Sequence, residues 1–199
     1  MRKSVWSCGG RVTTLSSMGK VFEAITPELR EWIAAQRMFF VATAPLAADG
    51  HVNCSPKGGD TFRILGPHEA AYADLTGSGI ETVAHLQENG RIVVMFCAFN
   101  GPPKIVRLHG RGEVIRPGTA EFARLRAHYG DLVGLRAIIR IDVTRVSDSC
   151  GYAVPCYDFV APRTVLDDFG HKLGPEGLAE YRARKNRTSV DGLPGMDGV

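Results

Sequence analysis

Residues 55–60 read Ser-Pro-Lys-Gly-Gly-Asp and follow a stretch that is typical of a β-strand. The hydroxyl of Ser55 and the ammonium of Lys57 stand beside two glycines, which let the backbone approach a ligand closely. This combination favours a site for a phosphate or for the edge of a flavin. The phosphate-binding loop of nucleotide hydrolases is excluded, because its Gly-x-x-x-x-Gly-Lys-Ser/Thr spacing is missing. A glycine-rich hairpin turn with a surface lysine remains the alternative interpretation.

A second group of polar residues lies in residues 74–82, which read DLTGSGIET. Ser78 and Glu81 have the spacing of a capping box, which would explain both residues structurally. The start of a helix also presents free N–H groups, here beside the hydroxyls of Thr76, Ser78 and Thr82, and such a place attracts an anion. Two glycines and three hydroxyls are more than capping requires. The capping and anion-binding interpretations are compatible, and both remain open.

Arg107 belongs to a third group, because it shares one face of an expected strand with His109 and Arg111. A solvated strand face is the simple interpretation of this alternation. The functional interpretation places Arg107 beside a bound anion or a flavin ring, across a dimer interface. An arginine at the pyrimidine end of the ring would stabilise the reduced, anionic flavin.

Other catalytic arrangements are missing from the sequence. It contains no Gly-x-Ser-x-Gly elbow and no His-Glu-x-x-His helix. The six histidines are scattered, so we expect no metal site. No catalytic residue can be named from these patterns.

The elements that must position these groups are mostly strands. Apolar alternation and turn signals predict strands at residues 38–43, 51–55, 62–65, 70–74, 91–99, 104–115 and 135–146. Helical patterns occur at residues 28–36, 80–88, 119–128 and 176–185. Antiparallel strands with few inserted helices predict a mainly β fold, a six-stranded antiparallel barrel with flanking helices, rather than a doubly wound sheet.

Bulk properties set limits on the class of protein. With 199 residues, 44% apolar and 23% charged, the chain has the composition of one globular domain. A net charge of +3, spread along the chain, argues against a nucleic-acid partner, and no apolar run reaches the length of about 20 residues that spans a membrane. Residues 1–17 lack the apolar core of a signal peptide, so we expect a disordered extension or a mis-assigned start there, and a cytoplasmic protein. Residues 18–199 would form the single domain, with a C-terminal helical and loop extension from about residue 147.

The order of these parts resembles the FMN-binding split barrel of the pyridoxamine 5′-phosphate oxidase-related family. The resemblance covers residues 22–146. It is carried by residues 72–79 (YADLTGSG), the helix after them, residues 88–96 (ENGRIVVMF) and residues 107–110 (RLHG), where the family strand ends in a glycine. Residues 149–155 and 191–195 look like an uncharacterised branch of that family.

The resemblance implies a homodimer with two FMN sites at the subunit interface. The phosphate would lie near Ser55, Lys57 and the helix start at residues 78–82. The flavin ring would lie along residues 54–58, with Arg107 reaching in from the partner subunit. The cofactor-binding residues implied in this way are Cys54, Ser55, Pro56, Lys57, Gly58, Thr76, Ser78, Gly79, Thr82 and Arg107.

The sequence also departs from the family oxidases. Gly79 and Ile80 stand where the oxidases carry an Arg-Lys pair, so one expected phosphate cation is missing. The oxidases also have a C-terminal Trp and Arg signature, whereas here Arg182, Arg184 and Arg187 lack a matching tryptophan. Oxidation of pyridoxamine phosphate is therefore not expected.

The function that we expect is an FMN-dependent oxidoreductase acting on a small-molecule substrate. A deazaflavin-dependent reductase of the same fold is the first alternative. A non-enzymatic flavin or haem carrier is the second, and its axial haem ligand would come from His51, His85 or His109.

Overall fold

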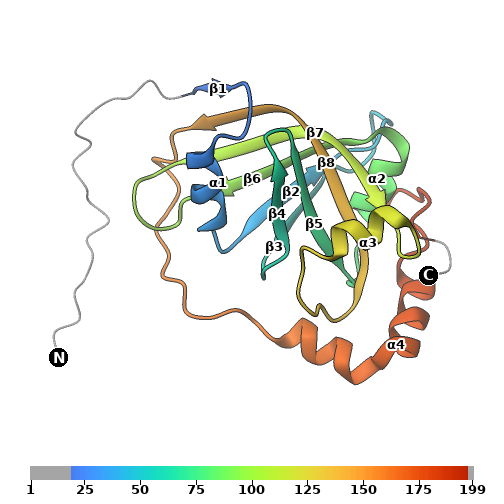
Figure 1. Ribbon diagram of the computed structural model, residues 1–199. Helices are drawn as coiled ribbons and strands as arrows, with labels where there is room; N and C mark the ends of the chain where they lie inside the picture. Colours follow the sequence, from blue (N-terminus) through green and yellow to red (C-terminus); the bar gives the residue numbers. More distant parts are fainter. Residues whose placement is uncertain (1–18, 197–199) are drawn as a thin grey trace, which may run out of the picture.

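The computed structural model describes residues 19–196, so the extension expected at residues 1–17 lies outside the described part. Eight strands form one antiparallel sheet in the order β3-β2-β6-β7-β8-β5-β4, and β1 pairs with β8 (Figure 1). The strands are β1 Val21–Phe22, β2 Phe39–Thr43, β3 Asn53–Lys57, β4 Phe62–Gly66, β5 Glu69–Leu75, β6 Arg91–Cys97, β7 Ile105–Ile115 and β8 Leu135–Ser149. The helices are α1 Pro27–Ala34, α2 Glu81–Asn89, α3 Ala120–Arg126 and α4 Val165–Lys185.

The sheet curls around an aromatic core. Its edge strands β3 and β4 are not hydrogen-bonded to each other in the sheet order, so the barrel is open along this line. Rings from four strands fill the interior with centroid separations of 5.0–5.8 Å, and they belong to Phe39, Phe62, Tyr72 and Phe96. Contacts between aromatic side chains therefore close the split barrel where backbone hydrogen bonds do not.

The mainly β, antiparallel barrel with flanking helices is confirmed. The described residues contain eight strands: the seven predicted strand ranges correspond to β2–β8, so the predicted count of six was too low, and β1 was not predicted. Strand β1 has only two residues, and so short a segment carries no alternation that a sequence pattern could reveal.

Helix α4 is also longer than the predicted helix at residues 176–185. The first half of α4 was not predicted, because Gly174, at a φ of 64°, and Pro175 interrupt the helical pattern.

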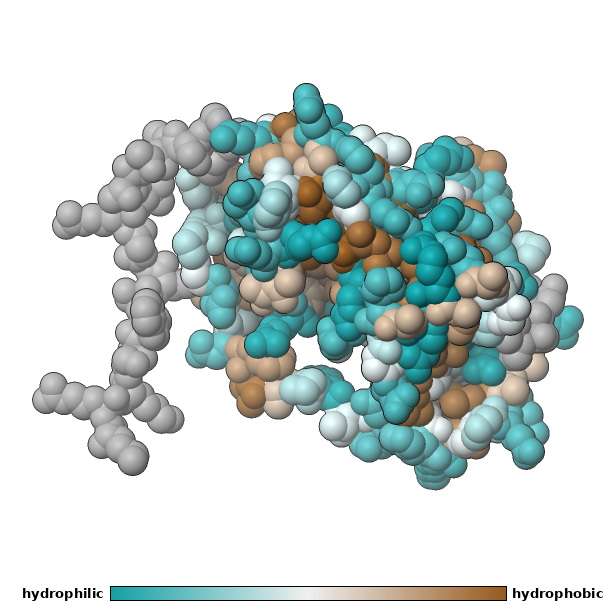
Figure 2. All heavy atoms as spheres, in the orientation of Figure 1, coloured by the Kyte–Doolittle hydropathy of each residue, from teal (hydrophilic) through white to brown (hydrophobic). Residues whose placement is uncertain are grey.

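The segment between β8 and α4 has no regular secondary structure and joins the barrel to the helix. In the space-filling view an opening separates this segment from the barrel (Figure 2). The segment exposes large apolar side chains, namely Tyr152, Tyr157, Phe159 and Val160. Its contacts with the barrel include the ring of Tyr157 on Phe99, at a centroid separation of 5.5 Å. Among residues 19–196, no helix combines the length and the apolar character needed to cross a membrane.

Gly110 does not end a strand, as the family pattern suggested, because β7 continues to Ile115. The pairing of β7 with β8 shifts register between His109 and Gly110. At this irregularity a Cβ on Gly110 would collide with the backbone carbonyl of Asp142. The glycine is therefore required by the close approach of two strands.

We expect Gly110→Ala to lower the free energy of unfolding by about 2 kcal/mol or more, because backbone atoms of β8 would have to move. Gly130→Ala is the matched control, since a Cβ there meets nothing within 4 Å, and its effect should stay within about 0.5 kcal/mol. Urea unfolding of both variants measures the difference. Equal midpoints for the two variants would contradict this account of Gly110.

Candidate functional site

Strand β3 divides the predicted cofactor residues between two faces of the sheet. Asn53, Ser55 and Lys57 are half-buried and alternate with the exposed residues Cys54 and Pro56. Successive side chains of a strand point to opposite faces, so the first three residues share one face and the other two share the opposite face. The predicted set therefore does not form a single surface within one chain.

Lys57 reaches a buried carboxylate at the end of β5. Its Nζ lies 3.1 Å from Oδ1 of Asp74, whose side chain is 0% exposed. Arg136 of β8 donates from Nε to the other carboxylate oxygen of Asp74 at 2.7 Å. Burial alone would raise the pKa of Asp74, but the charges and hydrogen bonds of Lys57 and Arg136 outweigh burial and lower it. Asp74 is therefore ionised and fixes two cations.

Arg136 also holds the loop between β5 and α2. Its Nη2 donates to the carbonyl of Gly79 at 2.9 Å, and its Nη1 donates to Oδ1 of Asn186 at 2.8 Å. Asn186 in turn donates from Nδ2 to the carbonyl of Gly77 at 2.9 Å. Two buried side chains thus fix the loop carbonyls on both sides of Ser78, which is exposed. Sequence reasoning missed Arg136 and Asn186 as site residues.

The predicted capping box at the start of α2 is wrong. The N-cap residue is Ile80, which makes no side-chain cap hydrogen bond, and the helix begins at Glu81 rather than after Ser78. A Cβ on Gly79 would lie 2.7 Å from Oε2 of Glu81, so Gly79 leaves room for this carboxylate beside the loop. The hydroxyl of Ser78 is consequently available for another partner.

Ser55 and Thr82 meet through Asn53, a residue that sequence reasoning missed. Ser55 Oγ donates to Asn53 Oδ1 at 2.8 Å, and Asn53 Nδ2 donates to Thr82 Oγ1 at 3.0 Å. Asn53 also donates to Thr43, which contacts Nδ1 of His85 at 2.9 Å. His85 is completely buried, and burial lowers its pKa, so this histidine is closed to a bulky ligand such as haem. The alternation of residues 53, 55 and 57 was the signal that could have identified Asn53.

Thr76 is also part of this polar group. Its hydroxyl donates to the carbonyl of Gly134 at 2.8 Å and accepts a hydrogen bond from Nη1 of Arg182 at 3.2 Å. Thr76 is 2% exposed, so its role is to connect neighbouring segments. The predicted residues that the structure brings into this region are Ser55, Lys57, Thr76, Ser78, Gly79 and Thr82.

Arg107 lies on the outer face of the sheet, in one row with Pro56. The row runs from Pro56 through Phe40 and Met95 to Arg107 on four adjacent strands. Neighbouring strands lie about 4.8 Å apart, so roughly 14 Å separates the backbones of Pro56 and Arg107. Arg107 Nη1 donates to Ser149 Oγ at 2.9 Å. Within one chain, Arg107 and Lys57 therefore cannot bind the same phosphate-sized group.

Gly58 and the outer-face residue Cys54 complete the predicted set. Gly58 follows β3 directly, and a Cβ there would lie 3.8 Å from the carbonyl of Arg37, which is ordinary contact. Cys54 is exposed and carries a free thiol. Among residues 19–196, no group of three or more His, Cys, Asp or Glu side chains is arranged to hold a metal ion.

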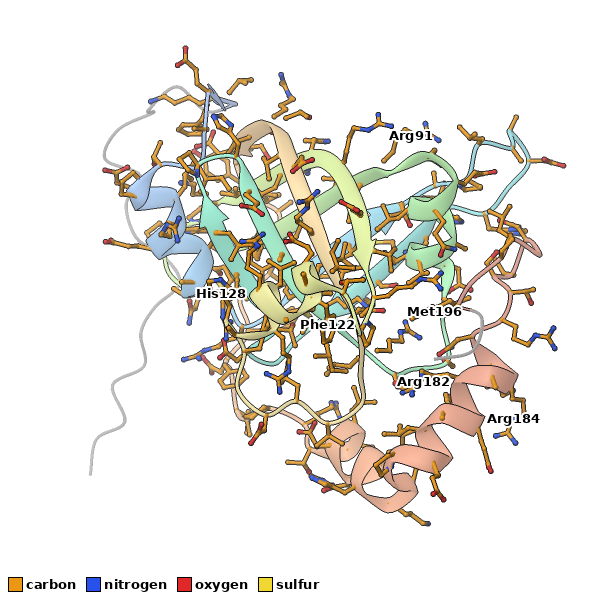
Figure 3. The ribbon with its side chains drawn as sticks, turned by 45° about the vertical axis from the view of Figure 1, so that its right-hand side comes forward. Arg91, Phe122, His128, Arg182, Arg184 and Met196 are labelled. Carbon is orange, nitrogen blue, oxygen red and sulfur yellow. The ribbon has the colours of Figure 1, made fainter. Side chains whose placement is uncertain are left out.

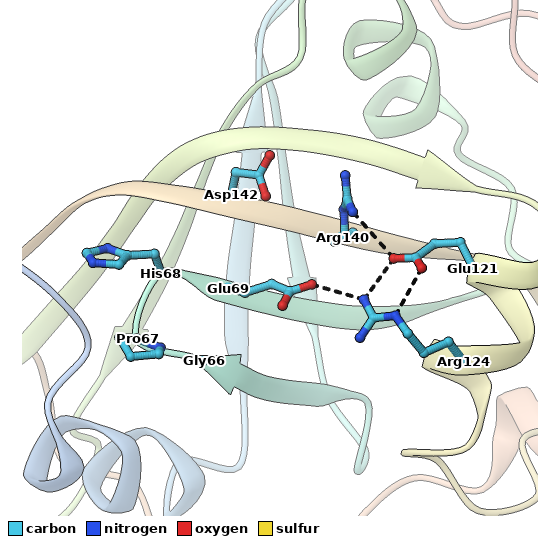
Figure 4. A pocket seen from close by; sticks show the side chains of 8 residues that line it. All are labelled: Gly66, Pro67, His68, Glu69, Glu121, Arg124, Arg140 and Asp142. Carbon is cyan, nitrogen blue, oxygen red and sulfur yellow. Dashed lines mark hydrogen bonds and ion pairs between the residues drawn. The ribbon is translucent and has the colours of Figure 1, made fainter.

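A cavity of about 620 Å³ lies elsewhere, at the turn between β4 and β5 (Figure 4). Its arginines already have carboxylate partners: Arg124 lies 3.1 Å from Glu69 and 2.8 Å from Glu121, and Arg140 lies 3.4 Å from Glu121. None of the predicted site residues lines this cavity. The polar region around Asp74 therefore remains the candidate site.

Comparisons with known protein families, sequences and structures identify proteins that are similar to this chain. The family model described as pyridoxamine 5′-phosphate oxidase matches residues 25–150. A protein of Aspergillus flavus, named pyridoxamine 5′-phosphate oxidase family protein ustO, is 41% identical over 192 residues, which cover 88% of this chain and 77% of that protein.

Solved structures match this chain at lower identity. A Lactobacillus delbrueckii protein, named provisionally as a pyridoxamine 5′-phosphate oxidase, has a TM-score of 0.50 and 14% identity over 65% of this chain and 98% of that chain. An FMN-binding protein from Syntrophomonas wolfei has a TM-score of 0.46 and 14% identity, over 60% of this chain and 80% of that chain.

We expect Asp74→Asn to lower the free energy of unfolding by about 3–5 kcal/mol, because it removes the partner of Arg136, whose side chain is 5% exposed. Asp131→Asn is the control, since the side chain of Asp131 is fully exposed and lies 3.7 Å from Arg126. Chemical unfolding at neutral pH measures both variants. Similar losses in the two variants would contradict the role assigned to Asp74.

The ion pair of Asp74 and Arg136 makes the stability of the folded protein depend on pH, and the direction of this dependence can be stated. Because the pKa of Asp74 is lowered in the folded state, its contribution to stability is complete above its unfolded pKa of 3.8 and is lost as the pH falls through the lower folded value. We therefore expect the stability difference between the wild type and Asp74→Asn to shrink below about pH 4. A difference that stays constant from pH 7 to pH 2 would contradict the ionised state of Asp74.

Proposed function

Because this chain belongs to the pyridoxamine 5′-phosphate oxidase family, we propose that it binds FMN and is an FMN-dependent oxidoreductase acting on a small molecule. The observation that carries the proposal is the excess of positive charge around Asp74. Lys57 and Arg136 both contact this one carboxylate, so the group has one cation more than it has anions. A phosphate supplies the negative charge that such a group lacks.

Lys57 is the cation best placed to bind the phosphate. An ammonium has three hydrogen-bond donors. Within the described residues, the side chain of Lys57 donates one hydrogen bond, to Asp74. Its side chain is 23% exposed, so the remaining donors can face a ligand. Arg136, by contrast, uses its donors on Asp74, Asn186 and the loop carbonyls, and it serves to position the site.

The start of α2 offers further donors at the end of the loop that Arg136 holds. Ser78 is exposed, and Ile80 makes no side-chain cap, so the first backbone N–H groups of the helix are not capped by a side chain. Backbone N–H groups at a helix start bind phosphate in many proteins. When bound, FMN supplies the redox chemistry, and the protein binds and orients it. The residues named here would hold the phosphate end.

The outer face of the sheet would hold the ring end of the cofactor through a second subunit. About 14 Å separates Arg107 from Pro56 within one chain, so both can meet one flavin only if it spans that distance or if a partner subunit supplies Arg107. A homodimer with the cofactor at its interface satisfies this geometry.

A visible absorption spectrum of the purified protein, with mass spectrometry of the small molecule that heat releases, tests the cofactor. We expect flavin absorbance and the mass of FMN. The mass of a deazaflavin would instead indicate a deazaflavin-dependent reductase. A haem spectrum, or a colourless protein that binds no added FMN, would contradict it.

We expect Lys57→Ala to weaken FMN binding roughly 10- to 100-fold, since it removes one charge-assisted hydrogen bond from the phosphate. Adding Ser78→Ala should weaken it further. Lys172→Ala is the control, because Lys172 is exposed on α4. Fluorescence titration of FMN into the cofactor-free proteins measures the affinities. An unchanged FMN affinity in the Lys57→Ala, Ser78→Ala double variant would contradict the proposal.

Light scattering tests the dimer, which should have twice the mass of the 21.6-kDa chain. Arg107→Ala should weaken FMN binding about tenfold without changing that mass. Arg111→Ala, on the same strand but exposed, should leave the affinity unchanged. A monomeric wild type with full FMN affinity would exclude a contribution from a partner subunit.

A further inference from the structure

Four arginines gather on the outer face of the sheet, on strands β6, β7 and β8. Arg107 and Arg111 lie on β7 with His109 between them, and side chains at alternate positions of a strand point to one face. Arg91 of β6, which Figure 3 shows on the outside of the barrel away from α4, is the direct partner of Arg111. Arg145 of β8 is the direct partner of His109. Directly paired residues share a face, so the four arginines form one surface, which we call the arginine patch.

The positive charge of the arginine patch is not matched by negative charge. Within residues 19–196, none of its four arginines forms an ion pair. Arg91 and Arg111 each donate a hydrogen bond to Asn89, which is neutral. A carboxylate borders the patch, because Asp142 of β8 is the direct partner of Arg111. With this charge counted, the patch still has an excess of cations.

The arrangement of these charges is unfavourable without a bound anion. Like charges that face each other directly across two strands destabilise a sheet, and Arg91 faces Arg111 in this way. At the centre of the patch the pKa of His109 is lowered, first by burial and then by the charges of Arg145 and Arg107. The lowered pKa agrees with a positive potential over the patch. An anion bound there would relieve the repulsion.

The extent of the patch matches a ligand with more than one phosphate. Arg107 and Arg111 are four residues apart, which is about 13 Å along a strand, and β6 and β8 lie about 10 Å apart on either side of β7. A single phosphate is too small to contact the whole patch. The half-buried side chains of Val93 and Met95 share this face and offer an apolar surface to a flat ring. Because guanidinium groups bind phosphates through paired hydrogen bonds, the patch suits a nucleotide.

We propose that the arginine patch binds the phosphates of a reduced pyridine dinucleotide, which is the electron donor of the protein. The inference rests on the proposed flavin function and names the donor that this function requires. Arg107 belongs both to the patch and to the proposed ring end of the flavin site, so a dinucleotide with its nicotinamide beside the flavin would place its phosphates on the other arginines. The dinucleotide gives up a hydride and is oxidised to the pyridinium form, and the flavin accepts the hydride together with one proton from water.

The first test is calorimetric titration of NADPH into the full-length protein after removal of bound flavin. We expect the double variant Arg111→Gln, Arg145→Gln to weaken NADPH binding about tenfold or more, because it removes two phosphate-binding cations. Asp142→Asn should tighten binding, since it removes the carboxylate that borders the patch. Arg184→Gln is the control, because it removes an exposed arginine of α4. This control should bind NADPH like the wild type.

The second test is the anaerobic reduction of bound FMN, followed by the loss of oxidised-flavin absorbance. The donors are NADH, NADPH and N-benzyl-1,4-dihydronicotinamide, of which the last carries no phosphate. In the double variant the half-saturating concentrations of both dinucleotides should rise about tenfold or more, and the rate with the phosphate-free donor should stay unchanged. An FMN affinity equal to that of the wild type shows that the double variant is folded and that its flavin site is intact.

The outcomes separate this inference from the proposed function. If the double variant binds NADPH like the wild type, or if neither dinucleotide reduces a wild type that binds FMN, the inference is overturned and the flavin function stands. An equal loss of rate with the phosphate-free donor would also overturn it, because the arginines would then act on the flavin. If the wild type binds no FMN, the proposed function fails and the inference falls with it.

Discussion

The buried carboxylate of Asp74 is the interaction on which the candidate site depends. An ionised group with a side chain that is 0% exposed is stable only when it is paired, and here a lysine from β3 and an arginine from β8 provide the pairing. The ion pairs therefore join three strands whose backbones are not all neighbours in the sheet. Because the same arginine also bonds Asn186, a single buried negative charge connects the barrel to the C-terminal helix.

The edge position of β3 adds a second constraint. One side of this strand pairs with β2, and the other has no strand partner in the sheet. Its inward residues bond to β5 and α2, whereas its outward residues continue the row that leads to Arg107. The two faces of this edge strand can contact one ligand only where the ligand passes around the edge or where a second subunit covers the outer face. For this geometric reason the proposed dimer and the proposed cofactor site depend on each other.

Local patterns were sufficient to predict the fold and to identify some residues of the candidate site. Alternation in the long strands was visible in the sequence, and so was the helical pattern at residues 28–36, which corresponds to α1. Lys57 and Ser78 were identifiable from their residue types beside glycines. Arg136 and Asn186 were not, because their partners lie 62 and 50 residues away and no local spacing encodes such a contact. The capping box failed for a related reason, since the carbonyl contacts of Arg136 set the conformation of the loop before α2.

Residues 191–195 of the C-terminal extension, a family-like motif without evident chemistry, have a physical role in holding this arrangement together. A Cβ on Gly195 would lie 2.7 Å from Cγ1 of Ile80, so only glycine lets the chain pass this close to the start of α2. The side chain of Gln87 on α2 donates to the carbonyls of Pro194 and Gly195 at 3.0 Å each. The extension thus contacts α2 through Pro194 and Gly195 and the preceding loop through Asn186 and Arg182. The barrel also holds this region, because Arg136 of β8 bonds the carbonyl of Gly79 and Asn53 of β3 bonds Thr82, so the start of α2 is positioned by the barrel and the extension together.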